Sequence, residues 1–217
     1  MAETMTAPAG TGHHAEHDDH AHVTNTGISN EKLGMWLFLG SECLLFGGLI
    51  STFLLYKKKL NTFPGFENTT VNKLGANLFD IPFTSVSSFV LLMSSLTMVL
   101  AVSALQRDDL RRTRAWLLAT ALLGSTFLAG QVYEFTAFVN EGLGFTTNIF
   151  SSAFFTLTGF HGAHVLIGII ILMTMYALSM RGRLSSRNAE ALEIAGLYWH
   201  FVDVVWVVIF VVVYLIK

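Results

Sequence analysis

The chain alternates between long apolar runs and shorter polar segments. Five of the runs are long enough to cross a membrane, because about 30 Å of hydrocarbon needs roughly 20 residues of helix. They lie at Leu33–Tyr56, Pro82–Leu105, Ala115–Val139, Phe150–Met180 and Ala195–Ile216. The runs are continuously apolar and do not alternate with polar positions, which predicts membrane-spanning α-helices and not the strands of a barrel.

The polar links between these runs are mostly short. The longest, Lys57–Ile81, contains Pro64, Gly65 and Asn68 and therefore predicts a loop. Short links favour an up-down arrangement of neighbouring helices. The expected fold class is all-α: a polytopic membrane protein with a five-helix antiparallel bundle at residues 33–217.

Residues 1–32 form a polar tail that precedes the bundle. It has no apolar periodicity, so we expect it to be disordered. The tail holds five of the eight histidines, namely His13, His14, His17, His20 and His22. Their irregular spacing defines no coordination geometry, which favours a solvated flexible arm over a site for divalent metal.

Composition agrees with a membrane protein. The 217 residues are 53% hydrophobic and 13% charged, whereas soluble domains average about 25% charged residues. The net charge of −2 gives no indication of a polyanionic partner. The single cysteine, Cys43, excludes an intrachain disulfide.

The distribution of lysine and arginine predicts the orientation. With the N-terminus inside, the inner segments hold eight basic residues: Lys32, Arg107, Arg111, Arg112, Arg114, Arg181, Arg183 and Arg187. The outer segments hold five: Lys57, Lys58, Lys59, Lys73 and Lys217. Because positive charge accumulates on the cytoplasmic side, we expect a cytoplasmic N-terminus and an outer, periplasmic C-terminus.

The apolar runs also contain ionisable side chains, which are costly in hydrocarbon and mark sites or contacts. There are six: Glu42, Glu134, His161, His164, His200 and Asp203. No lysine or arginine lies deep in a run. That excludes a retinal protein, which needs a lysine for its Schiff base, and a voltage sensor, which needs arginines.

Four of these residues are paired by spacing. His161 and His164 are three residues apart, as are His200 and Asp203, so each pair shares a helix face. Three imidazoles and a carboxylate on neighbouring helices could bind a metal. The preferred interpretation is a structural network in which His200 and Asp203 pair with the His161/His164 face and lock the bundle.

The two glutamates differ in position. Glu42 lies more than two turns into the first run, so it is either protonated or paired with another helix. A proton-carrying role is one interpretation and a structural hydrogen bond is the preferred one. Glu134 lies near the end of the third run, where we expect an interfacial carboxylate close to water.

Two further features concern helix packing and lipid. Small residues recur at helix-packing spacing at Gly47/Ser51, Ala121/Ser125/Ala129 and Gly159/Gly162. Arginines that follow the fourth run, Arg181, Arg183 and Arg187, could contact lipid phosphates or could serve topology alone.

Two sequence motifs resemble a known family. They are Gly159-Phe-His-Gly-Ala-His-Val-Leu-Ile-Gly168 and Tyr198-Trp-His-Phe-Val-Asp-Val-Val-Trp206. Both resemble signatures of subunit III of the haem–copper oxidases. Ser41-Glu42 is similar to that family's helix with a membrane-buried acid, and Gln131–Phe135 is similar to its Q-x-x-E-Y-type segment. The matches cover residues 33–217.

The resemblance implies a function. Subunit III belongs to the terminal oxidase that reduces O₂ to water and pumps protons, here a cytochrome c oxidase of the bacterial plasma (inner) membrane. Haem and copper belong to subunits I and II, so this chain is expected to carry no catalytic, cofactor-binding or metal-binding residue. The family's subunit III packs against subunit I, binds structural phospholipid and supports proton uptake. A small subunit IV and a larger respiratory supercomplex are further candidate partners; no nucleic acid is expected.

The chain departs from the family in one respect. Many members have seven helices and this sequence predicts five, which leaves the family's lipid cleft incomplete. Two alternative functions stay open: subunit III of a quinol oxidase, and a stand-alone metal or proton transporter that uses the His161/His164/His200/Asp203 cluster.

Overall fold

A computed structural model describes residues 29–59, 81–140, 144–146, 149–185 and 189–215. The described residues form five long helices, α1 (Asn30–Lys59), α3 (Ile81–Gln106), α4 (Leu110–Asn140), α5 (Ile149–Met180) and α6 (Ala189–Phe210), and the π-helical turn η2 (Val211–Leu215). All five, the last together with η2, are long and apolar enough to cross a membrane. The predicted all-α, five-span fold is confirmed.

The helices extend beyond the apolar runs that predicted them. The fifth begins at Ala189 instead of Ala195, and the third at Leu110 instead of Ala115. The apolar run marks the part suited to hydrocarbon, whereas a helix continues until a cap ends it. Asp109 caps α4, because its side chain accepts from the backbone N–H of Arg112 at 3.1 Å.

The first helix likewise begins earlier than the boundary of the predicted tail. It starts at Asn30, with the Ser29 hydroxyl 3.3 Å from the Lys32 backbone nitrogen as its cap. The last three residues of the predicted tail are therefore helical. The five histidines of the tail lie outside the described residues.

Two helices end in the same left-handed cap on the side of the bundle where α1 begins. Gly182 follows α5 with φ +67°, and Asp108 follows α3 with φ +61°. In each cap the next residue returns its backbone N–H to the last turn, at 3.0 Å in both the Arg183–Leu178 and the Asp109–Ala104 bond.

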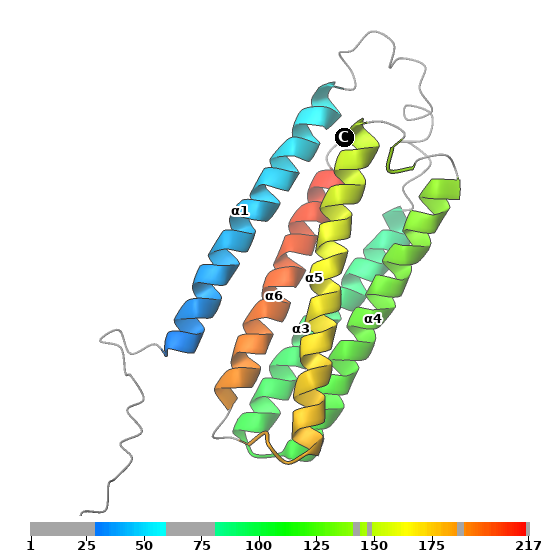
Figure 1. The fold of residues 1–217 in the computed structure, drawn as a ribbon. Coiled ribbons are helices and arrows are strands. Elements are labelled where there is room, and N and C mark those ends of the chain that lie inside the picture. Colours follow the sequence, from blue (N-terminus) through cyan, green and yellow to red (C-terminus); the bar gives the residue numbers. More distant parts are fainter. Residues whose placement is uncertain (1–28, 60–80, 141–143, 147–148, 186–188, 216–217) are drawn as a thin grey trace, which may run out of the picture.

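Helix α6 is the core of the bundle. It packs against α1, α3 and α5, while α4 lies on the far side of α3 and α5 (Figure 1). More than half of its membrane-spanning window is buried (56%), against 17–33% in the other four helices. The sequence that resembles a family signature, Tyr198–Trp206, is thus the central packing element of the fold.

The outer surface is apolar along most of the bundle. Large hydrophobic side chains stay exposed on each of the five helices, among them Leu37, Leu44, Val86, Leu122, Ile170 and Val204. Exposed apolar side chains on all the helices are what a bilayer solvates, and this agrees with a multi-pass membrane protein.

Candidate functional site

Glu42 of α1 is paired with His164 of α5. Its Oε2 lies 3.1 Å from Nε2 of the imidazole, and both side chains are mostly buried. The aromatic ring of Phe46 packs edge-on to His164, and Tyr198 of α6 donates its hydroxyl to the His164 carbonyl at 3.1 Å. The pair therefore lies where α1, α5 and α6 meet. Of the two interpretations left open for Glu42, pairing with another helix is confirmed.

The hydrogen bonds fix how many protons this pair holds. Nδ1 of His164 lies 2.8 Å from the Phe160 carbonyl, which only accepts, so Nδ1 carries a hydrogen. The contact between Nε2 and the glutamate then needs one more proton, on either the acid or the ring. In both forms the pair has no net charge, which suits its depth in the membrane.

A second polar contact joins α3 to α6. The hydroxyl of Ser95 donates to Oδ2 of Asp203 and lies 2.9 Å from Nδ1 of His200. A serine hydroxyl has one hydrogen, so it donates to one partner and accepts from the other. When Asp203 is ionised, the chain of hydrogen bonds runs from His200 through Ser95 to the carboxylate.

Glu134 forms a third contact, at the opposite end of the bundle from the α3–α4 turn. Its Oε1 accepts from the Thr84 hydroxyl at 2.6 Å and from the Tyr214 hydroxyl at 3.3 Å. Only 8% of the residue is exposed. The expectation of an interfacial carboxylate close to water was wrong, because Thr84 of α3 and Tyr214 of η2 cover the acid.

His161 stands apart from all three contacts. It is fully buried, its ring stacks on Trp206 at 4.9 Å, and neither ring nitrogen has a hydrogen-bond partner among the described residues. The predicted joining of His200 and Asp203 to a His161/His164 face was therefore wrong. Nor does any group of three His, Cys, Asp or Glu side chains within the described ranges lie close enough to hold a metal ion.

His161 and His164 have different partners because they face different directions around α5. Residues three apart on a helix differ by about 60° around its axis. That difference directs His161 toward Phe127 and Trp206, and His164 toward Glu42 on α1.

Serines of α3 are the partners that the sequence interpretation missed. Trp199 donates its indole N–H to Ser94 at 3.0 Å, and Trp206 donates to Ser88 at 2.8 Å. Ser88 and Ser95 are seven residues apart, and Thr84 is four before Ser88. This spacing places hydroxyls on one face of the second run and could have indicated a polar seam.

The small residues that allow close helix approach are only partly those predicted: a Cβ on Gly162 would lie 2.9 Å from Oε1 of Gln131 on α4. A Cβ on Gly124 of α4 would lie 2.5 Å from Cη2 of Trp199, and one on Gly168 of α5 would lie 2.8 Å from the same indole. By contrast, a Cβ on Gly47 or Gly159 would meet nothing within 4 Å. Ser125 and Ala129 are exposed, and of the predicted positions Ala121 and Gly162 are buried.

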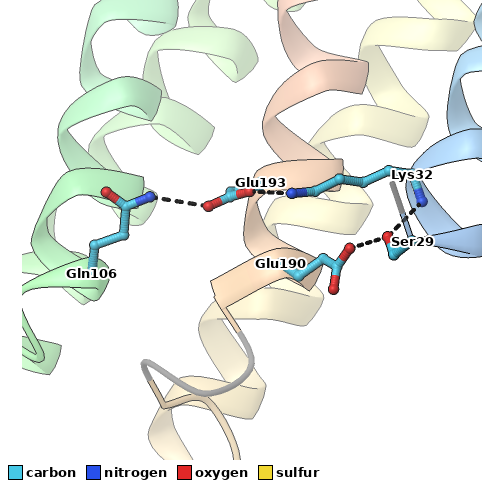
Figure 2. Close-up of polar contacts among 5 residues, drawn as sticks. All are labelled: Ser29, Lys32, Gln106, Glu190 and Glu193. Atoms are coloured by element: carbon cyan, nitrogen blue, oxygen red, sulfur yellow. Dashed lines mark hydrogen bonds and ion pairs between the residues drawn. The ribbon is translucent and has the colours of Figure 1, made fainter. Parts of the chain in front are cut away.

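A polar bridge crosses the bundle where α1 begins (Figure 2). Glu193 of α6 accepts from Lys32 of α1 at 2.8 Å and from Gln106 of α3 at 3.0 Å. Ser29 also donates to Glu190 of α6. At the other end Lys57 donates to the Val212 carbonyl of η2 at 3.2 Å, so α1 is tied to the last membrane span at both of its ends.

The predicted lipid contacts are only partly within the described residues. Arg181 and Arg183 follow α5 and are exposed, whereas Arg187 lies outside the described residues. Arg114 occupies the same end of the bundle and binds Ser179 of α5 through its hydroxyl (3.0 Å) and its carbonyl (2.6 Å).

Comparison with known proteins identifies the family. The family model for cytochrome c oxidase subunit III matches residues 12–217. The chain belongs to this family. Cytochrome c oxidase subunit 3 of Bacillus sp. (strain PS3) is 43% identical over 186 residues, covering 86% of each chain. Quinol oxidase subunit 3 of Bacillus subtilis is 38% identical over 207 residues, covering 93% of this chain and 96% of the relative.

Family membership makes this chain a subunit III of a terminal oxidase, and so a member of a multi-subunit oxidase complex. The resemblance carried by the Gly159–Gly168 and Tyr198–Trp206 motifs is confirmed. A stand-alone transporter built on a His/Asp cluster is not favoured, because relatives along most of the chain are oxidase subunits and the four side chains do not form one cluster.

Proposed function

We propose that this chain is the accessory subunit III of a bacterial cytochrome c oxidase that reduces O₂ to water and pumps protons. Its partners are subunits I and II, which carry the haem and copper; a small subunit IV and a supercomplex are further candidates. The observation that carries the proposal is the family match over residues 12–217. It is supported by the intramembrane acids Glu42, Glu134 and Asp203, each of which binds another helix of this chain.

In this proposal the buried polar residues hold the bundle in a form that subunit I can bind. Glu134, His200 and Asp203 fasten α3 to its neighbours, and His161 fills the core between them. The Glu42–His164 pair fastens α1 and keeps one proton inside the membrane. An unpaired carboxylate at that depth would cost several kcal/mol, so the shared proton makes the contact stable.

The proposed location is the plasma (inner) membrane, with the N-terminus in the cytoplasm and the C-terminus outside. The excess of lysine and arginine on the N-terminal side supports this orientation. The cytoplasmic end then carries the Lys32–Glu193–Gln106 bridge and the exposed Arg181 and Arg183, for which we propose contacts with phospholipid headgroups.

A second candidate is subunit III of a quinol oxidase. It is favoured by the similarity to two relatives. They are the quinol oxidase subunit 3 of Bacillus subtilis (38% identical) and the probable quinol oxidase subunit 3 of Staphylococcus saprophyticus (39% identical). The donor site would lie in other subunits, so these identities do not separate the two activities.

Oxygen consumption by the purified complex decides between them. We expect rapid turnover with reduced cytochrome c and little with a quinol, together with a dinuclear copper signal from subunit II. Turnover with the quinol alone would assign the complex to the quinol oxidases and overturn the choice of donor while leaving the subunit assignment intact.

A further inference from the structure

A cavity of about 360 Å³ opens between α1, α3 and α6 at the end of the bundle where α1 begins. It is lined by the polar residues Lys32, Glu193 and His200 and by the apolar residues Val102, Gly196 and Leu197. The Lys32–Glu193 ion pair lies at its mouth, where both side chains are about one-third exposed (Figure 2). A polar space of this size has room for several water molecules, because one takes about 30 Å³ in the liquid. The cavity therefore gives water access to His200.

His200 connects this cavity to the buried contact between α3 and α6. Its Nδ1 lies 2.9 Å from the Ser95 hydroxyl, which donates to Oδ2 of Asp203. Its Nε2 forms no hydrogen bond with the described residues. Unlike both ring nitrogens of His161, it is not among the buried atoms that lack a partner, so it borders the cavity. One imidazole thus faces water with one nitrogen and Ser95 with the other.

This arrangement can pass a proton inward without leaving a charge on the carriers. With Asp203 ionised, a neutral His200 donates its Nδ1–H to Ser95, and Ser95 donates to the carboxylate. A proton from cavity water binds Nε2, the Nδ1 hydrogen moves to the Ser95 oxygen, and the serine hydrogen moves to Oδ2. One proton has entered and one has reached Asp203, while the imidazole is neutral again in its other tautomer.

The path ends at Asp203. The other carboxylate oxygen, Oδ1, is buried and has no hydrogen-bond partner among the described residues, so no onward acceptor follows it there. An ionised carboxylate with a buried, unpaired oxygen is costly inside a membrane, and a bound proton removes that charge. The geometry is therefore that of a protonation site with one entrance and not that of a channel.

Few titratable groups face His200. Lys32 of α1 and Glu193 of its own helix face it across the cavity and pair with each other. Helix α3 contributes Val102 to the lining and Ser95 to the ring contact, and neither titrates. The remaining group is Asp203, beyond Ser95.

We propose that His200 and Ser95 carry protons between cavity water and Asp203, which makes the α3–α6 contact a pH-sensitive switch. The contact holds a carboxylate when the water at this end of the bundle is alkaline and a neutral acid when that water is acidic. The proposal concerns the charge of this contact alone, and it depends on neither the electron donor nor proton delivery to the haems.

The test uses the purified oxidase complex and infrared difference spectroscopy after a jump from alkaline to acidic pH. The C=O band of protonated Asp203, identified by its loss in Asp203→Asn, reports arrival of the proton. We expect the band to rise roughly tenfold more slowly, or slower still, in His200→Gln than in wild type, because an amide cannot bind a proton on one atom and release one from another. The amide keeps a donor for Ser95, so the contact itself is preserved.

Two pairs of variants separate the path from general damage. Ser95→Ala should slow the band as His200→Gln does, whereas Ser95→Thr, which keeps the hydroxyl, should retain the wild-type rate. Val102→Phe fills the cavity and should also slow the band. Val99→Phe is its matched control, because Val99 lies one turn earlier on α3, is exposed and does not line the cavity.

Three results would overturn the proposal. The first is an Asp203 band that does not change with pH, which would mean that this acid keeps one charge state. The second is an equal rate in wild type and His200→Gln, which would mean that the proton arrives by another route. The third is an equal effect of Val102→Phe and Val99→Phe, which would mean that the cavity is not the entrance.

Discussion

Ser95 and Asp203 join α3 to the central helix α6 through a hydrogen bond, and the same serine oxygen contacts His200 at 2.9 Å. One hydroxyl thus serves two ionisable groups in the interior of the bundle. The other carboxylate oxygen of Asp203, Oδ1, has no hydrogen-bond partner among the described residues. The uncharged Ser95 thus supplies a hydrogen-bond partner inside the membrane for both His200 and Asp203 of the Tyr198–Trp206 motif.

Replacing Ser95 should destabilise the protein. Ser95→Ala removes the hydrogen bond to a buried carboxylate, which we expect to lower the free energy of unfolding by about 1–2 kcal/mol. Thermal unfolding of the detergent-solubilised complex measures the change. Ser125→Ala is the control, because that exposed serine binds only the Ala121 carbonyl of its own helix. Equal stability of the two variants would contradict the role given to Ser95.

Asp203→Ala should weaken the association of the bundle, because Ser95, which also contacts His200, then loses its acceptor on α6. We expect reduced retention of the subunit during detergent purification. The double variant Ser95→Ala/Asp203→Ala should lose less than the sum of the two single variants, since the residues act through one hydrogen bond. Additive losses, or full retention in Asp203→Ala, would show that the contact does not hold the helices.

Two substitutions at Glu42 should differ in effect. Glu42→Gln can donate an amide hydrogen to Nε2 of His164, so we expect an assembled complex with an unchanged haem spectrum. Glu42→Leu leaves Nε2 buried without a donor and should loosen α1 by about 1–3 kcal/mol. Subunit retention and the optical spectrum are the readouts. Loss of haem from the Gln variant would refute an accessory role for this residue.

The Trp199 packing predicts a contrast between two glycines. Gly124→Ala places a methyl group 2.5 Å from the Trp199 ring, and overpacking of this kind costs about 1–3 kcal/mol. Gly159→Ala meets nothing within 4 Å and should leave stability unchanged. Melting temperatures of the two variants provide the comparison; a stable Gly124 variant would show that the indole can move aside.

The bridge in Figure 2 should contribute little. Both side chains of the Lys32–Glu193 ion pair are about one-third exposed (33% and 32%), and such pairs are worth about 0.2–1 kcal/mol. Lys32→Met should therefore lower stability only slightly, with a difference from wild type that shrinks in high salt. A loss as large as that of Ser95→Ala would mean that the bridge is a main fastening of α1.

The membrane spans could be predicted from sequence because length and apolarity are local properties. The pairing of buried groups could not, because it depends on which helices meet. His161 and His164 have the same residue type and nearly the same position, yet one stacks on Trp206 and the other binds Glu42. Glu134 was placed near water from its position in its own run, while its cover comes from Tyr214, eighty residues later.

The family motif Tyr198–Trp206 predicted a contact, and that interpretation agrees with its place in the bundle core. The partners were misassigned because charged groups were matched only with other charged groups. Hydroxyls of α3 are the partners instead: Thr84 binds Glu134, Ser88 and Ser94 accept from the two tryptophans of the motif, and Ser95 contacts His200 and Asp203. Their periodic spacing was visible in the second apolar run.

The central claim is that this chain works as an accessory subunit whose haem and copper reside on its partners. The most direct test is affinity purification of the tagged chain from native membranes in mild detergent. A reduced-minus-oxidised spectrum is recorded, and the co-purifying chains are identified. We expect a complex that shows a haem spectrum and contains subunits I and II. Isolation of the chain alone, without haem and without partner subunits, would contradict it.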